Sequence, residues 1–375
     1  MILLLRNYNN VFSKFWWQTD KQILLPIFLL FCISIILVIT ASPYVAIRIG
    51  VEPLYFIKHH ILYSLLSMLI IFCIFHLNEK QLIMLSLIGF SISLLLMCWV
   101  IFMGTDVKGA KRWVYILGFS IQPSEFAKVF FIGFMAYMWD YTNKLNLKVL
   151  YKYFIWVLIY TLFAGLLLLQ PDVGMTILIT ATFFVLLILT GISWFWGVLF
   201  SFLGSLLMVA AYFIFPHVNY RVNNFFLDKH PYQIEKALEA ISSGKILGKG
   251  AGQGSLKAAL PDAHTDFIFT VGLEEFGLVF GLFLIYLYIY LIIRIIKHIK
   301  QKNSMIAILS LAGYVSLLAT QTLIHIFSNV NLMPTKGMTL PVISYGGSSL
   351  FATAILMGMI LNLTKKDANS IRIKN

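Results

Sequence analysis

ILLPIFLLFCISIILVIT, residues 23–40, is an apolar run without a charged side chain, and it follows a basic start that holds Arg6, Lys14 and Lys21. About 20 apolar residues in helical form cross the hydrocarbon core of a bilayer, so this run is typical of a membrane-spanning helix. It is longer than the apolar part of a cleaved secretion signal. We therefore interpret it as a signal anchor and the first span.

Similar runs recur along the rest of the chain. Only Gly191, Ile192 and Ser193 separate the sixth run from the seventh, which together are too long for one span. The runs predict an all-α integral membrane protein of ten helices, forming one polytopic domain over 1–375, with a large outer loop at 216–266 between the seventh and eighth helices. The predicted spans are 23–41, 59–77, 82–103, 124–140, 152–170, 174–192, 194–215, 267–293, 305–329 and 343–363.

Composition supports a membrane protein and argues against soluble classes. Of the 375 residues, 60% are hydrophobic and only 11% are charged, whereas about a quarter of a soluble domain is charged. A net charge of +13 suggests nucleic-acid binding in a soluble protein, but here it has another explanation, and we expect no nucleic-acid partner. Cys32, Cys73 and Cys98 lie in apolar runs without metal-ligand spacing, so we interpret them as packing residues.

The basic residues indicate the orientation. With both termini in the cytoplasm, lysines and arginines of the short inner segments outnumber those of the outer segments by about two to one, as the positive-inside rule requires. This predicts a multi-pass membrane protein with both termini in the cytoplasm. Most carboxylates fall on the outer side, so we expect any chemistry to take place there.

The outer loop contains one periodic segment. Apolar side chains recur at helical spacing over 232–243, with charged residues between them and Gly244 as a stop, which predicts a short amphipathic helix at the outer membrane surface. We find no strand pattern anywhere in the chain.

Polar residues on the outer side gather first around KGAKRW, 108–113, and QPSE, 122–125. Pro123 suits the first turn of a helix, and Glu125 and Lys128 share a helix face. Two interpretations stay open: an ion pair that holds the helix end, which the spacing favours, and a phosphate site made by Lys111 and Arg112. Gln122 and Ser124 belong to the same group of polar residues.

The next two segments contain acidic residues near helix starts. In QPDVG, 170–174, Asp172 is expected to cap the sixth spanning helix. In HTDF, 264–267, Thr265 or Asp266 is expected to cap the eighth, beside His264. Glu274 and Glu275 lie about two turns inside that helix, where carboxylates need partners or water. They predict buried ion pairs or a polar cavity.

The last segment is PTKGMTLPVISYGGSS, 334–349. Two prolines frame a lysine, Lys336, which predicts a broken or re-entrant segment that lines a cavity or is buried in protein. Ser344 and Tyr345 follow it. Two interpretations stay open for Gln321 and His325, which are four residues apart: they face the same cavity, or they are buried structural polar groups. A carboxylate beside a lysine can act as a general base on a hydroxyl, but these residues alone do not separate an enzyme from a transporter.

Taken together, KGAKRW, QPSE, QPDVG, HTDFIF, EEFG and PTKGMTLPVISYGGSS resemble the SEDS glycosyltransferases, and PTKGMTLP is more similar to the division members than to the elongation members. The resemblance implies ten helices in the bacterial inner membrane. It also implies polymerisation of lipid II into a nascent glycan strand at the outer face of that membrane, at the division septum. It implies that Asp266 is the essential carboxylate, and that Arg112, Glu125, Lys128 and Lys336 are cavity residues.

The resemblance also implies partners: a class B penicillin-binding protein and other divisome membrane proteins. It leaves room for a divalent cation, Mg or Mn. A lipid II flippase and a non-catalytic divisome scaffold are the competing hypotheses. A carrier needs ionisable groups near the bilayer midplane, whereas those of this chain are biased to the outer end. A scaffold predicts that the cavity carboxylates are dispensable.

Overall fold

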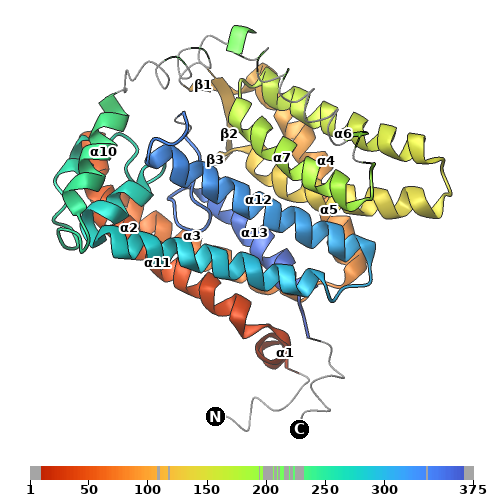
Figure 1. The fold of residues 1–375 in the computed structure, drawn as a ribbon. Coiled ribbons are helices and arrows are strands. Elements are labelled where there is room, and N and C mark those ends of the chain that lie inside the picture. Colours follow the sequence, from red (N-terminus) through yellow and green to blue (C-terminus); the bar gives the residue numbers. More distant parts are fainter. Residues whose placement is uncertain are drawn as a thin grey trace.

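The computed structural model describes residues 10–107, 110–116, 119–193, 232–334 and 337–366, with isolated residues between 195 and 223. Figure 1 shows long, roughly aligned helices, with a small sheet and α10 at the end opposite α1. The helices are α1 (Val11–Gln18), α2 (Lys21–Arg48), α3 (Tyr55–Phe75), α4 (Glu79–Met103), α5 (Pro123–Lys144), α6 (Val149–Leu169), α7 (Val173–Leu189), α10 (Tyr232–Gly244), α11 (Ile268–Ile299), α12 (Met305–Asn329) and α13 (Gly347–Leu363), with a 3-10 turn at Leu256–Ala259.

Within these described ranges, six helices are long and apolar enough to cross a membrane: α2, α3, α4, α6, α11 and α12. Two shorter apolar helices, α7 and α13, accompany them, and α5 is less apolar because it carries charged residues such as Lys128 and Asp140. The chain is a multi-pass helical membrane protein. The predicted seventh span, 194–215, falls mostly outside the described residues, so the number of ten stays a prediction.

The beginning of α2 and the end of α13 meet at one end of the molecule. The backbone amide of Lys366, just after α13, donates to the carbonyl of Gln18 at 3.0 Å, just before α2. The start of the first span and the end of the last therefore lie on the same side.

Helix α12 forms the centre of the bundle. It contacts α5, α7 and α11, while α13 packs on α3 and α5 and α2 packs on α3 and α11. The molecule buries 67% of the most apolar window of α12, against 22% for α6. Polar side chains on α12 must therefore find partners inside the protein.

The structure corrects the expectation that no strand occurs. Strands β1 (Thr105–Val107), β2 (Ala110–Ile116) and β3 (Phe119–Ile121) form an antiparallel sheet in the order β1-β2-β3. Trp113, Val114, Tyr115 and Ile116 favour extended backbone, but their segment is short and also carries two basic residues. The sheet contacts α4, α5 and α13 and so places Arg112 at the ends of these helices.

Helix α11 is broken at Gly277, whose φ is 77°. The amides of Leu278 and Val279 donate to the carbonyls of Lys245 and Ile246 at 3.0 and 3.2 Å. In return, the carbonyls of Glu274 and Glu275 accept from the amides of 249 and 250 at 3.1 and 2.9 Å. The loop thus replaces two hydrogen bonds that an unbroken helix would make. A Cβ at Gly277 would lie 2.3 Å from the carbonyl oxygen of Ile246, so there is no room for a side chain at the break.

The amphipathic helix predicted at 232–243 is confirmed as α10. Its buried residues include Ile234, Ala237 and Ala240, and it packs on α11. It ends at Gly244, as predicted, where a Cβ would lie 2.1 Å from the carbonyl oxygen of Leu273. Close approach of two backbones therefore requires glycine here.

Candidate active site

Asp266 lies in a turn that leads into α11. The carbonyl of Asp262, a residue with φ of 55°, accepts from the amides of Thr265 and Asp266 at 3.0 and 3.1 Å.

The prediction that Thr265 or Asp266 caps α11 is wrong. The N-cap is Phe267, and it makes no side-chain cap bond. Instead, Oδ1 of Asn329 on α12 accepts from the amide of Thr270 at 3.4 Å and from its hydroxyl at 2.8 Å.

Three bonds from other elements hold this turn. The hydroxyl of Ser344 donates to the carbonyl of Thr265 at 2.7 Å, and the backbone amide of Tyr345 donates to the carbonyl of His264 at 3.0 Å. The side-chain amide of Asn329 donates to the carbonyl of Asp266 at 2.9 Å. The backbone that carries the predicted catalytic carboxylate is therefore fixed at three consecutive residues.

The carboxylate of Asp266 lies against the predicted broken segment. A Cβ at Gly337 would lie 2.6 Å from its Oδ2, so glycine leaves the space that the carboxylate occupies. Lys336, the sequence neighbour of Gly337, lies outside the described residues. The structure thus joins HTDF to PTKG, two motifs that are far apart in the sequence.

The segment from Gly337 to Tyr345 is not helical, and three helices bind it. His325 Nδ1 on α12 donates to the carbonyl of Met338 at 2.6 Å. The hydroxyl of Tyr288 on α11 donates to the carbonyl of Pro341 at 2.5 Å. The hydroxyl of Ser34 on α2 donates to the carbonyl of Ile343 at 2.8 Å. These bonds satisfy carbonyls that a helix would satisfy internally, so the prediction of a broken segment is confirmed.

Backbone strain marks the same segment. Val342 has φ of 69°, a left-handed conformation that is a genuine outlier for a β-branched residue. Strained backbone persists where the surrounding structure over-determines it. Helix α13 begins at Gly347, later than the predicted span at 343, because Ser344 and Tyr345 hold the Asp266 turn.

The predicted pair of Glu125 and Lys128 is confirmed and is buried. Lys128 Nζ lies 2.6 Å from Glu125 Oε2, and the two side chains are 2% and 8% exposed. The same amino group donates to Gln321 Oε1 at 3.0 Å. Gln321 in turn donates to the carbonyl of Thr339 at 2.9 Å, and the hydroxyls of Thr339 and Ser349 are 2.6 Å apart. A buried polar chain therefore runs from α5 through α12 to the segment beside Asp266.

The start of α5 is joined to the start of α13. The backbone amide of Gln122 donates to the hydroxyl of Ser348 at 3.1 Å, and this hydroxyl donates to the carbonyl of Ser120 at 3.0 Å. The side-chain amide of Gln122 donates to Ser124 at 3.1 Å. The QPSE and SYGGSS motifs thus form one contact beside the sheet.

Arg112 and Lys111 do not act as a pair. They are neighbours on β2, so their side chains point to opposite faces, and Lys111 is exposed. Arg112 Nε donates to the carbonyl of Gln170 at 3.0 Å, and its Nη2 donates to the carbonyl of Pro171. Its Nη1 lies 3.9 Å from Asp172 Oδ2. Asp172 also caps α7, as predicted, by accepting from the amide of Met175 at 3.1 Å. Arg112 therefore anchors the sheet on the α6–α7 turn while staying partly exposed.

His264 is buried between two aromatic rings, Phe56 at 4.4 Å and Tyr345 at 5.1 Å between centroids. Burial lowers the pKa of His264 to about 4, with a smaller opposing effect of Asp262 and a further lowering by Arg48. The ring is therefore neutral near pH 7. It supports the turn by packing rather than by charge.

Glu274 and Glu275 form buried ion pairs, one of the two alternatives that the sequence left open. Glu274 is fully buried and accepts from Lys249 Nζ at 3.3 Å and from the amides of Leu256 and Lys257 at 3.0 Å each. Glu275 pairs with the amino group of Lys257, and both side chains are nearly unexposed. These carboxylates fasten the outer loop to the broken helix α11.

The described residues contain no group of three or more histidine, cysteine, aspartate and glutamate side chains that could hold a metal ion.

A family model described as "Cell cycle protein", covering FtsW, RodA and SpoVE, matches residues 21–369. The chain belongs to this family. It is thus a SEDS protein, as its motifs indicated.

SEDS relatives resemble it over nearly their whole length. The protein named probable peptidoglycan glycosyltransferase FtsW of Caulobacter vibrioides (strain NA1000 / CB15N) is 36% identical, covering 96% of this chain and 93% of its own. The protein of the same name from Wigglesworthia glossinidia brevipalpis is 33% identical, covering 95% and 96%. The predicted similarity to the division members agrees with these names.

Solved structures share the SEDS fold. One, described as structural coordination of polymerization and crosslinking by a peptidoglycan synthase complex, contains a chain with a TM-score of 0.76 and 25% identity, covering 92% of this chain and 97% of its own. RodA of Thermus thermophilus, described as a rod shape determining protein, has a TM-score of 0.68 and 26% identity, covering 93% and 97%.

Sequence reasoning missed two parts of this SEDS site. Asn329 was not predicted, although it lies four residues beyond His325 and eight beyond Gln321 on α12, and helical spacing could have extended that set. Ser349, the last residue of PTKGMTLPVISYGGSS, was not assigned a partner, yet its hydroxyl lies 2.6 Å from that of Thr339.

Proposed function

We propose that the protein is an inverting peptidoglycan glycosyltransferase that polymerises lipid II at the outer face of the inner membrane, for septal wall synthesis. The observation that carries this proposal is the turn of Asp266, fixed through three carbonyls with its carboxylate against Gly337. Rigid placement of a carboxylate is what a general base requires. The names of the relatives, peptidoglycan glycosyltransferases, support the same reaction.

In the proposed reaction, Asp266 takes the proton from the 4-hydroxyl of the acceptor sugar. The hydroxyl oxygen forms a bond to the anomeric carbon of the donor, and the bond from that carbon to the lipid diphosphate breaks with inversion. Negative charge develops on the leaving diphosphate, so nearby cations stabilise the transition state. Lys336, next to Gly337 in the sequence, and the partly exposed Arg112 are the proposed cations.

Lys128 takes a different role in this proposal. Its amino group is buried between Glu125 and Gln321, so we assign it to positioning the segment at Thr339 rather than to contact with the diphosphate. His264 and Thr265 likewise act by shaping the turn. A Mg or Mn ion, if the reaction uses one, would be held mainly by the substrate diphosphate, and no step here depends on it.

The proposed partners are a class B penicillin-binding protein, other divisome membrane proteins, and the growing glycan strand. The fold that the chain shares with a member of a peptidoglycan synthase complex supports the first of these. Cytoplasmic termini and a location at the septum belong to the same proposal, supported by the basic residues that follow α11 and α13.

The test is polymerisation of labelled lipid II in proteoliposomes that contain the chain and its cognate class B partner. Asp266→Asn should abolish polymer, because an amide cannot accept the proton. Glu52→Gln is the matched control: it also removes a carboxylate from the predicted outer side, but that carboxylate is exposed and bonds Lys58. Equal polymer from wild type and Asp266→Asn would overturn the proposed base. Lipid II translocation without polymer would favour the flippase, and absence of both would favour the scaffold.

A further inference from the structure

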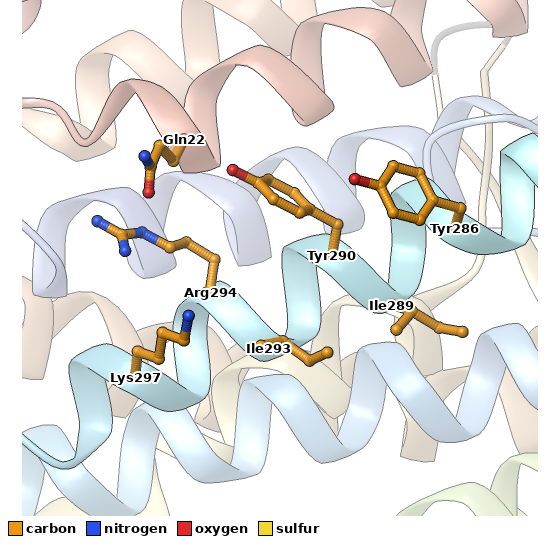
Figure 2. Close-up of a pocket in the computed structure, with 7 residues that line it drawn as sticks. All are labelled: Gln22, Tyr286, Ile289, Tyr290, Ile293, Arg294 and Lys297. Carbon is orange, nitrogen blue, oxygen red and sulfur yellow. The ribbon is translucent and has the colours of Figure 1, made fainter.

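A groove lies between the start of α2 and the C-terminal half of α11, at the end of the molecule that carries α1 (Figure 1). Its lining, drawn in Figure 2, consists of Gln22, Tyr286, Ile289, Tyr290, Ile293, Arg294 and Lys297. A helix rises about 1.5 Å per residue, so Arg294 lies roughly 40 Å along α11 from the Asp266 turn. The groove is therefore separate from the candidate active site.

Polar groups from two helices converge in this groove. Tyr286, Tyr290, Arg294 and Lys297 follow one another at spacings of three and four residues, so they share one face of α11. In Figure 2, the amide of Gln22, the hydroxyl of Tyr290 and the guanidinium of Arg294 point into the same space, and the amino group of Lys297 is turned toward Arg294. Within the described part of the chain, the side chains of Gln22, Tyr286, Tyr290 and Lys297 make no hydrogen bond, which leaves them available to a ligand.

Asp20 fixes the guanidinium and leaves the groove positive. Oδ2 of Asp20 lies 2.9 Å from Arg294 Nε, 2.8 Å from its Nη2 and 2.7 Å from His298 Nε2. Burial would raise the pKa of Asp20, but hydrogen bonds from His298, the amide of Gln22 and Arg294 lower it overall, so the carboxylate stays charged. Asp20 thus balances Arg294, while Lys297 has no acidic partner among the described residues. The surplus charge favours an anion.

The apolar part of the groove completes the match to a lipid. Ile289 and Ile293 lie exposed along the lining, with Ile293 next to Lys297 and Ile289 farther along α11, toward Tyr286. Tyrosines and basic residues at one end of a span are typical of the head-group region, with apolar side chains deeper in the bilayer. A ligand with one anionic end and one hydrocarbon end would contact every part of this lining.

We propose that this groove binds an anionic phospholipid of the adjacent leaflet, with its phosphate at Lys297 and Arg294, hydrogen bonds from Gln22 and Tyr290, and an acyl chain along Ile289 and Ile293. The bound lipid bridges α2 and α11 at the end where the chain enters and leaves the bundle. A zwitterionic lipid has the same tails but no net charge, so it binds more weakly.

The experiment uses the full chain, purified in a neutral detergent. Phosphatidylglycerol, phosphatidylcholine and the water-soluble glycerol 3-phosphate are titrated while the midpoint of thermal unfolding is recorded, and retained lipid is counted by native mass spectrometry. A ligand that binds only the folded state raises the midpoint. We expect phosphatidylglycerol to raise it and to be retained, and the other two to have little effect.

Lys297→Gln is the test variant, because it removes a cation that has no acidic partner in the described ranges and leaves the Asp20 contacts intact. Lys300→Gln is the matched control, an exposed lysine near the same helix end that does not line the groove. We expect Lys297→Gln to weaken phosphatidylglycerol about five-fold and Lys300→Gln to leave it unchanged. Equal loss in both variants, equal binding of phosphatidylcholine, an equal shift with glycerol 3-phosphate, or no lipid effect would each overturn the proposal.

Discussion

The side-chain amide of Asn329 donates to the carbonyl of Asp266 at 2.9 Å and to that of His325 at 2.9 Å. Its oxygen accepts from the hydroxyl of Thr270. One buried residue at the end of α12 thus joins the proposed catalytic turn to the first turn of α11. The position of the Asp266 carboxylate therefore depends on α12, the most buried of the candidate spans.

Asn329→Ala should lower polymerisation strongly, by about ten-fold or more, and should lower stability by about 1–3 kcal/mol, because buried donors and acceptors lose their partner. Thr270→Val is the matched control, since it removes a bond to Asn329 but leaves the bond to Asp266. We expect it to lower the unfolding midpoint while polymerisation per folded molecule stays near wild type. Equal loss of activity in both variants would show that Asn329 acts only through stability.

Lys128→Met should be among the most destabilising single changes in the spans, by about 3–5 kcal/mol, because it leaves the buried carboxylate of Glu125 without its cation. The double variant Lys128→Met with Glu125→Gln should recover part of that stability, since no uncompensated charge remains. Thermal unfolding in detergent measures both effects. A double variant no more stable than Lys128→Met would contradict the assignment of a buried pair.

The sequence predicted most of the helices, because an apolar run long enough to span a bilayer has few other stable forms. It also predicted the pair of Glu125 and Lys128, which needs only three-residue spacing, and the ion pairs of Glu274 and Glu275, which follow from the cost of a buried charge. Each of these predictions rests on local spacing or on a general penalty.

The contacts that build the site were beyond such reasoning. Ser344, Tyr345 and Asn329 reach the HTD turn from segments 63–81 residues away along the chain, and no local pattern indicates which carbonyl each one bonds. The capping prediction for Thr265 or Asp266 failed because the acceptor comes from a distant segment: Asn329 on α12 accepts the hydrogen bond from the amide of Thr270. The sheet was missed because its strands are short and partly charged.

His264 predicts a dependence of stability on pH. Its pKa falls to about 4 when folded, mainly through burial, from an ordinary value of 6.5. The unfolded chain therefore binds a proton between these values that the folded chain does not, so stability is full above pH 6.5 and falls as the pH drops toward 4. The loss from this one residue is of order 2–3 kcal/mol.

His264→Phe should flatten that part of the profile, because a phenyl ring can pack between Phe56 and Tyr345 but takes up no proton. Thermal unfolding midpoints of the two proteins, measured from pH 7.5 to pH 4.5, give the comparison. Parallel profiles would mean that other groups cause the acid sensitivity.

Gly277→Ala tests the break in α11. The residue has φ of 77°, and a Cβ would lie 2.3 Å from the carbonyl oxygen of Ile246 and 2.4 Å from the amide nitrogen of Gly248. Gly252 has the same φ of 77° but no atom within 4 Å of an added Cβ, so Gly252→Ala isolates the backbone strain. That strain costs about 1–2 kcal/mol.

Because the clash at Gly277 is with backbone, we expect Gly277→Ala to lose clearly more stability than Gly252→Ala. We also expect faster amide exchange at Leu278 and Val279, whose hydrogen bonds to the loop would break. Equal losses in the two variants, with exchange at 278 and 279 unchanged, would show that the loop does not depend on glycine at the break.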